Sequence, residues 1–376
     1  MKTPLIIIIL FVSLMTPIFA QSQNDSASQQ SAFNWEILYT GDLVNNFDGG
    51  IKSGTMYLGL VNAKLGFDFE KADWWKGGEL FLNIANTHGG KPSEQLVGDF
   101  QGVSNIEAGN LTFLYELWYK QRFGNIAFTI GLQDLNATFA ASENGTVFNN
   151  SSFGIQSSIS DNIPTPIFPL TALGIMFEWE INNTFSIHTA LYDGTPDHYE
   201  NNPFNVNWKL SNEDGYLSVG ELRFKKSLIR NLDATYKFGA YFHEHNDNTP
   251  QEQENGGVYL IADQEIYSNE KTTLSLFSQI GFSPKSKNNH NHYYSLGINC
   301  RGIFGRSADM AGLAIAYAGI DKNIIDSETA MELTYQLQIN KWIYLRPDIQ
   351  YIIDPAGTDR KLENAVVAFL RLGIKI

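Results

Sequence analysis

The chain has 376 residues, enough for one large domain or two ordinary ones, and a net charge of −14 at pH 7. This acidity argues against a nucleic-acid-binding protein, because binding to phosphates needs a basic face. The single cysteine, Cys300, excludes an intramolecular disulfide and a cysteine-based metal cluster.

The first residues have the features of a secretory signal. Lys2 supplies the positive end, residues 5–14 the apolar core, and Ile-Phe-Ala at 18–20 a cleavage site, so we expect residues 1–20 to be removed. An uncleaved inner-membrane anchor is the alternative. Residues 21–32 are polar and predicted to be mobile. No other stretch approaches the roughly 18 apolar residues of a membrane-spanning helix, so a membrane location would require strands.

Apolar and polar residues alternate with a period of two in about sixteen segments, which indicates strands with one apolar face. These segments lie near residues 33–40, 56–68, 78–86, 113–123, 126–134, 173–180, 184–192, 216–225, 235–243, 257–267, 273–282, 293–301, 311–318, 328–338, 343–353 and 365–375. The connections after odd-numbered segments, starting with 41–55, are predicted to be the longer ones. Long loops on one rim and short turns on the other indicate an all-β chain, with a transmembrane antiparallel up-and-down β-barrel over residues 33–376. In this reading the long loops are extracellular and the short turns periplasmic.

The segment 113–123 shows what each face of such a barrel would carry. Tyr115, Leu117 and Tyr119 are predicted to face lipid. The lumen face would then carry the mixed charges and the indole of Glu116, Trp118, Lys120 and Arg122. Charged groups are costly against lipid but suit a narrow aqueous channel. They can hydrogen-bond several sugar hydroxyls, while an indole offers a flat face to the C–H surface of a sugar.

The longest connection, residues 135–172, has no periodicity, and a structureless loop of this length is usually functional. The motifs around it are Gln-Asp-Leu-Asn at 133–136, Phe-Ala-Ala-Ser-Glu at 139–143, Asn-Asn-Ser-Ser-Phe-Gly at 149–154, Pro-Leu at 169–170 and Tyr-Asp-Gly at 192–194. Further motifs are Gly-Val-Tyr at 257–259, Asp-Gln at 263–264 and Leu-Arg-Pro-Asp-Ile-Gln-Tyr at 345–351. With these motifs in this order, the chain resembles the carbohydrate-selective porin family typified by OprB.

The resemblance implies a bacterial outer-membrane porin for passive, carbohydrate-selective diffusion of mono- or oligosaccharides, with no cofactor and no enzymatic step. It also implies that residues 135–172 fold inward and narrow the pore, as the third extracellular loop does in general porins. The other expected partners are outer-membrane lipid and the barrel insertion machinery, and both a monomer and a trimer are compatible with the sequence. The chain ends in Ile376, whereas bacterial barrels commonly end in an aromatic residue that the insertion machinery recognises.

Further lumen candidates follow from the same alternation and from the matched motifs. Besides Glu116, Trp118, Lys120 and Arg122, we predict that the pore is lined by Asp134, Glu143, Glu178, Glu221, Arg223, Arg346, Asp348 and Gln350. Asp134 and Glu143 could also pair with lumen arginines and pin the long loop. The alternative for every one of these residues is a structural ladder of charges that holds the loop and never meets solute.

Three other hypotheses remain open at this point. One is a general or differently selective porin on the same barrel. Another is a hydrolase that uses Ser186 or Ser275 with His188, although no activating constellation is visible. The third is metal binding at His243-Glu244-His245 or His290-Asn291-His292, where a strand would place both histidines on one face.

Overall fold

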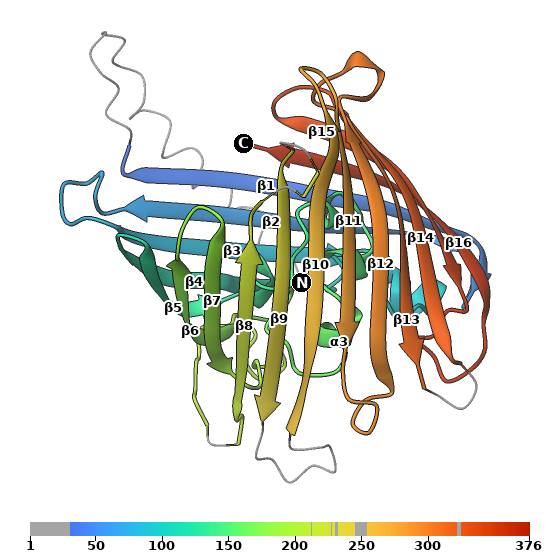
Figure 1. The fold of residues 1–376 in the computed structure, drawn as a ribbon. Helices are drawn as coiled ribbons and strands as arrows, with labels where there is room; N and C mark the ends of the chain where they lie inside the picture. Colours follow the sequence, from blue (N-terminus) through green and yellow to red (C-terminus); the bar gives the residue numbers. More distant parts are fainter. Residues whose placement is uncertain (1–30, 212, 227, 230–231, 245–253, 322–324) are drawn as a thin grey trace, which may run out of the picture.

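The structure is a computed structural model and describes residues 31–376 apart from 212, 227, 230–231, 245–253 and 322–324. The predicted signal peptide 1–20, nearly all of the polar segment 21–32 and His245 lie outside the described residues. The described residues form sixteen antiparallel strands, each paired with its sequence neighbours, and β1 pairs with β16 to close a barrel (Figure 1). The strands are β1 (Phe33–Gly50), β2 (Gly54–Asp68), β3 (Gly78–Gly89), β4 (Leu111–Phe123), β5 (Ile126–Gln133), β6 (Ala172–Glu180), β7 (Phe185–Asp193), β8 (Tyr216–Phe224), β9 (Ala234–Glu244), β10 (Glu254–Ser268), β11 (Thr273–Phe282), β12 (His290–Arg301), β13 (Met310–Ile320), β14 (Ser327–Gln338), β15 (Ile343–Ile353) and β16 (Glu363–Lys375). The predicted antiparallel barrel is confirmed.

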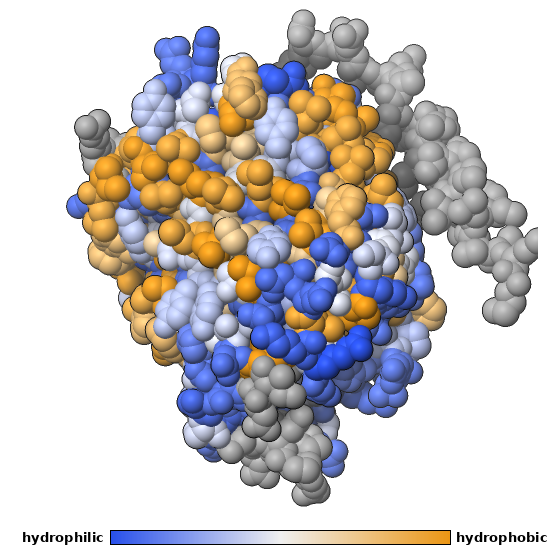
Figure 2. Space-filling model, turned by 90° about the vertical axis from the view of Figure 1, so that its right-hand side faces the viewer, coloured by the Kyte–Doolittle hydropathy of each residue, from blue (hydrophilic) through white to orange (hydrophobic). Residues whose placement is uncertain are grey.

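The two faces of the wall differ as the alternation predicted. Phe128 and Ile130 of β5 are 44% and 59% exposed, whereas Ala127 and Thr129, which alternate with them, are buried. Apolar side chains cover much of the outer surface, and hydrophilic ones gather toward one rim (Figure 2). Such a surface matches a lipid-facing band. Among the described residues, no helix is long and apolar enough to cross a membrane.

Long connections lie mostly on one rim, as predicted, but the first connection is an exception. β1 continues to Gly50 and β2 begins at Gly54, so the predicted long loop over 41–55 is wrong. Asp42 and Asn46, which lie within that predicted loop, point inward and are buried. The Asn46 amide donates to the carbonyl of Leu96 at 3.2 Å. Polar partners inside the barrel therefore allow this strand to continue.

A β-bulge in β4 corrects one face assignment. Asn83 pairs with Glu116 and Ile84 with Leu114, so Tyr115 is an extra residue without a partner in β3. A bulge turns two successive side chains to the same side. Tyr115 is consequently 7% exposed, and the prediction that it faces lipid is wrong.

Two long connections turn into the barrel. Residues 134–171 contain four short helical segments, η2 (Leu135–Ala137), η3 (Gly145–Val147), α2 (Ser151–Gly154) and α3 (Ser157–Ser160). Residues 90–110 contain η1 (Ser93–Val97), and on the other rim η4 (Ile303–Gly305) lies between β12 and β13. α3 lies behind the wall strands, inside the barrel (Figure 1). No pattern in residues 90–110 indicated that this segment also folds inward.

Candidate functional site

Buried carboxylates of the wall hold residues 134–171 inside the barrel. Both oxygens of Glu332 accept backbone N–H groups of the loop, from Asn149 at 2.6 Å and Asn150 at 2.9 Å. On the other side, Asp263 accepts from the Ser142 hydroxyl at 2.6 Å. Carboxylates that accept backbone N–H groups make stronger hydrogen bonds than neutral acceptors do. The wall thus fixes the backbone of the loop and not only its side chains.

Glu221 and Arg223 form a second anchor. The guanidinium of Arg223 donates to Glu221 at 2.5 Å and to the carbonyl of Thr138 at 2.6 Å. Glu221 also accepts from the Ala140 N–H at 3.1 Å and from the Tyr259 hydroxyl at 2.7 Å. Both predicted pore-lining residues are therefore engaged in binding the loop, which was the alternative stated for them.

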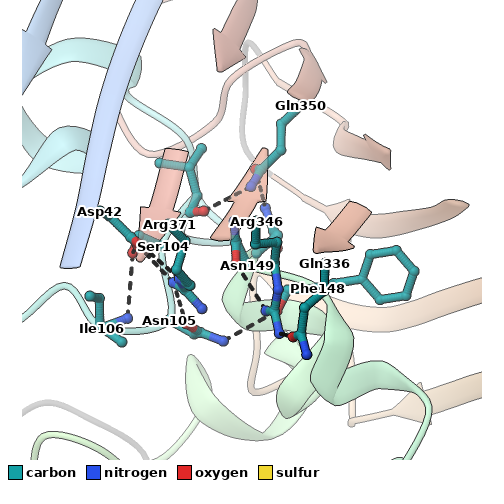
Figure 3. Close-up of polar contacts among 12 residues, drawn as sticks. Asp42, Ser104, Asn105, Ile106, Phe148, Asn149, Gln336, Arg346, Gln350 and Arg371 are labelled. Carbon is teal, nitrogen blue, oxygen red and sulfur yellow. Dashed lines mark hydrogen bonds and ion pairs between the residues drawn. The ribbon is translucent and has the colours of Figure 1, made fainter. Parts of the chain in front are cut away.

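An ion pair across the seam of the barrel anchors the other inward segment (Figure 3). Arg371 of β16 donates to both carboxylate oxygens of Asp42 of β1, at 2.6 and 2.7 Å. The Ser104 hydroxyl donates to the same carboxylate at 2.8 Å, and Asn105 accepts from Arg371 at 2.8 Å. Asp42 and Arg371 were not among the predicted site residues. Their positions in the first and last strands of a closed barrel could have suggested the pair.

The C-terminal candidates lie beside this cluster. Arg346 donates to Asn149 Oδ1 at 3.3 Å, and Gln350 donates to the carbonyl of Val103 at 2.9 Å. Asp348 is 6% exposed, and its carboxyl group lies beside that of Glu332. Arg346 and Gln350 thus touch both inward segments and join them to β15.

Apolar packing adds to these polar anchors. One cluster joins loop side chains to the inner wall through Leu135, Phe139, Ile155, Ile159, Ile163, Tyr192, Leu217, Tyr241 and Tyr259. Another comprises Val147, Phe148, Phe153, Phe277, Tyr293, Ala314 and Ala316. The loop therefore has a buried apolar underside, and burial of these side chains adds favourable free energy to the polar anchors.

The hydrogen bonds from residues 138–162 to the wall run to strands between β8 and β15. The candidates on β4 and β6 belong to another part of the wall. Lys120 of β4 and Glu178 of β6 form an ion pair, with side chains 20% and 13% exposed. The Trp118 indole donates to Glu116 at 3.3 Å, and Arg122 is exposed. Glu116 is buried, but the other side chains of this wall, two cations, one carboxylate and one aromatic ring, are at least partly exposed.

A polar cavity of about 610 Å³ opens beside the tip of the loop. It is lined by Glu143, Asn144, Thr146, Val147, Asp233, Ala234, Thr235, Asp263, Gln264, Glu265, Thr273, Ser275, Asn299, Arg301, Met310, Gln336 and Arg346. Carboxylates, cations, amides and hydroxyls therefore surround one space, and this mixture can serve a neutral solute that carries many hydroxyl groups. Of the predicted residues, Glu143 and Arg346 reach it.

Asp134 marks the entrance of the chain into the long loop. Its carboxylate accepts from the Tyr115 hydroxyl at 2.6 Å and from the Asn136 N–H at 2.8 Å, so it caps the first helical turn. Burial raises the pKa of Asp134 to about 7, and the hydrogen bond from Tyr115 opposes that shift. Asp134 positions the loop, and no arginine among the described residues forms an ion pair with it.

The geometry gives little support to the hypotheses of a metal site and of a hydrolase. His290 is buried, with one ring nitrogen 2.9 Å from the Ser157 hydroxyl, whereas His292 contacts the rings of Tyr294 and Tyr317. A register shift separates the two histidines, so the prediction that they share a face is wrong. Among the described residues, no group of three metal-binding side chains occurs. The Ser186 hydroxyl and the two ring nitrogens of His188 also have no hydrogen-bond partner among the residues that the structure describes.

Comparison with known proteins agrees with this architecture. The model of the carbohydrate-selective porin family OprB matches residues 52–376. Porin B of Pseudomonas aeruginosa is 24% identical over 410 residues, which cover 92% of this chain and 87% of the relative. The putative porin QuiX of Acinetobacter baylyi is 22% identical over 401 residues, with 92% and 89% covered. Among solved structures, the high-pH structure of Pseudomonas putida OprB superposes with a TM-score of 0.82 at 19% identity, over 92% of this chain and 94% of that one.

Proposed function

The chain belongs to the OprB family of carbohydrate-selective porins, and we propose that sugars cross it through the space that the inward loop leaves beside the β4–β6 wall. It is a porin of the bacterial outer membrane. Transport of this kind is diffusion down a gradient and needs neither a cofactor nor a covalent step. The family and the fold indicate a channel and not an enzyme.

The observation that carries this proposal is the fixed position of residues 134–171. Sixteen strands enclose an aqueous lumen much wider than one sugar, so selectivity needs a segment that narrows it. The bonds from Glu332 and Asp263 to loop backbone and side-chain donors support a rigid constriction. A mobile loop would not discriminate between solutes of similar size.

The predicted site residues then have two roles. We propose that solute contacts come from Glu116, Trp118, Lys120, Arg122 and Glu178 on the β4–β6 wall and from Glu143 and Arg346 at the cavity. We assign a positioning role to Asp134, Glu221, Arg223 and Gln350, because their side chains bind the inward segments. Asp348 interacts with the carboxyl group of Glu332, which accepts the Asn149 and Asn150 N–H groups of the loop. Each contact with a sugar must be weak, since a channel that holds its solute does not conduct.

The barrel insertion machinery is a further partner that we propose. The C-terminal strand ends against β1, where the Ile376 N–H donates to the carbonyl of Ile37 at 2.9 Å. The Ile376 side chain is 56% exposed, so a partner can reach it.

A liposome-swelling assay tests the proposed function. Proteoliposomes should swell faster in monosaccharides than in amino acids or anions of comparable size, and more slowly in disaccharides. Equal rates for sugars and amino acids of the same size would favour the general porin. Failure to swell in any sugar would overturn the proposal.

A further inference from the structure

Two aromatic side chains meet on the part of the lumen wall beside the proposed path. Phe81 of β3 and Trp118 of β4 lie opposite each other in the sheet register. Their rings are stacked, with centroids 4.9 Å apart and an interplanar angle of 25°. Both side chains are half-buried, whereas Phe148 and Phe153 of the long loop are at most 1% exposed. The Phe81–Trp118 pair, unlike the aromatics of the loop, can therefore meet a molecule in the lumen.

The strands on either side leave this pair uncovered at its flanks. The residue opposite Phe81 in β2 is Gly66, and the residue opposite Trp118 in β5 is Gly131. Neither glycine has a side chain that could pack on the rings. Beyond Gly66, the Asn34 side chain reaches across the glycine, since a Cβ added there would lie 2.0 Å from its Oδ1 atom. The pair is thus bordered by backbone and by one amide.

Groups that can hydrogen-bond hydroxyls surround the rings on the neighbouring rows of the wall. On one side of the two rings, Lys64 of β2, Asn83 of β3 and Glu116 of β4 lie opposite one another across the sheet. The Trp118 indole donates to Glu116. On the other side, Lys120 and Glu178 form their ion pair. The side chains of Lys64 and Lys120 are 32% and 20% exposed, so both can reach a bound molecule.

We propose that the Phe81–Trp118 pair is a binding subsite for the pyranose ring and makes the channel prefer cyclic sugars to acyclic polyols of the same size. A pyranose with equatorial hydroxyls has a flat C–H face that packs against an aromatic surface, while its hydroxyl edge points outward to polar partners. An acyclic polyol has the same hydroxyl groups but no rigid apolar face. The inference rests on the proposed sugar permeation and adds the feature of the sugar that is recognised.

The test is block of the ion current through single channels in planar bilayers by glucose and by sorbitol. The wild-type channel should bind glucose more tightly than sorbitol. Trp118→Leu and Phe81→Leu keep apolar volume but remove a ring, and each should weaken glucose binding by roughly 2- to 10-fold, the range for loss of an aromatic contact. Sorbitol binding should stay within twofold. Trp118→Phe, which keeps a ring, should retain most of the preference for glucose.

Phe128→Leu is the matched control, because Phe128 lies on the outward face of the adjacent strand and packs on Phe177. This substitution should change the binding of neither glucose nor sorbitol. If both lumen variants bind glucose as the wild type does, or lose glucose and sorbitol equally, the pyranose subsite is wrong although the channel still passes sugars. Absence of block by glucose in the wild type would also rule out the subsite, whereas failure of the proteoliposomes to swell in any sugar would overturn the proposed function itself.

Discussion

Arg371 and Asp42 form a two-pronged ion pair across the junction where the last strand of the barrel meets the first, with N–O distances of 2.6 and 2.7 Å. Both side chains are almost inaccessible, and the pair also binds the inward segment 90–110 through Ser104 and Asn105. One interaction therefore connects closure of the barrel to the position of a segment in its lumen.

Removing one partner of this pair should destabilise the barrel strongly. Arg371→Gln or Asp42→Asn leaves one buried charge uncompensated, and such changes cost about 3–5 kcal/mol. We expect a clear fall in the temperature at which the detergent-solubilised protein shifts from folded to unfolded mobility on a gel. Asp68→Asn, which breaks the exposed pair with Lys71, is the control and should change little. If Asp68→Asn lowered this temperature as much as Arg371→Gln or Asp42→Asn, the role of the Asp42–Arg371 pair would be contradicted.

Loosening the loop anchor should widen the pore without opening the wall. Glu332→Ala removes both acceptors of the Asn149 and Asn150 N–H groups. Because these groups are then unsatisfied, the middle of the loop should move, and single-channel conductance should rise and become noisier. Glu332→Gln retains one acceptor oxygen and should have a smaller effect. Unchanged conductance in a folded Glu332→Ala channel would show that this anchor does not set the pore width.

The two faces of β2 offer a test of the wall itself. Ala63 is exposed on the outer face, while its neighbour Asn62 points inward and is half-buried. Arginine at a lipid-facing position near the bilayer midplane costs roughly 2–4 kcal/mol, and arginine facing an aqueous lumen does not. Ala63→Arg should thus reduce the amount of folded protein in the outer membrane, whereas Asn62→Arg should insert normally and alter conductance. Similar insertion of both variants would invalidate the assignment of faces.

The segment 90–110 should become less ordered as the pH rises. Burial raises the pKa of Asp99 to about 6 and, together with the neighbouring charge of Asp99, that of Glu107 to about 7. A carboxyl group with a raised pKa stabilises the fold while it is protonated, and this contribution is lost as the pH rises through the folded-state pKa. Hydrogen exchange of residues 90–110 should therefore accelerate between pH 5 and pH 8.

The double variant Asp99→Asn, Glu107→Gln provides the comparison for this pH effect. After correction for the intrinsic pH dependence of exchange, its protection over residues 90–110 should vary much less between the two pH values. A variant as pH-sensitive as the wild type would assign the effect to other groups.

Alternation alone was sufficient to predict the barrel and the faces of most strands. Phe128 and Ile130 face outward as expected, because a period of two leaves no other arrangement when one side must meet lipid. The bulge at Tyr115 could not be predicted, since one unpaired residue depends on the partner strand and leaves no mark in the sequence of β4. The strand through Asp42 was missed for a related reason: its polar side chains are satisfied by residues distant in the sequence.

The alternation of apolar and polar residues predicts which charged side chains face the lumen, but it does not predict their roles. Glu221 and Lys120 both point inward, and no local pattern separates them. Glu221 accepts a backbone N–H from Ala140, whereas Lys120 pairs with Glu178 of the wall itself. This difference arises from where the long loop comes to rest, which apolar packing of residues such as Phe139 and Ile159 decides.

The most direct test of the proposed path is to shorten the loop. Residues 146–160, replaced by a short Gly-Ser linker, include the anchor residues Asn149 and Asn150 and the buried Phe148 and Phe153. Conductance and sugar block are then measured in planar bilayers on channels that still show heat-dependent gel mobility. We predict a larger single-channel conductance together with weaker discrimination between mono- and disaccharides. A folded deletion variant that conducts as the wild type does and still discriminates between these sugars would contradict the account.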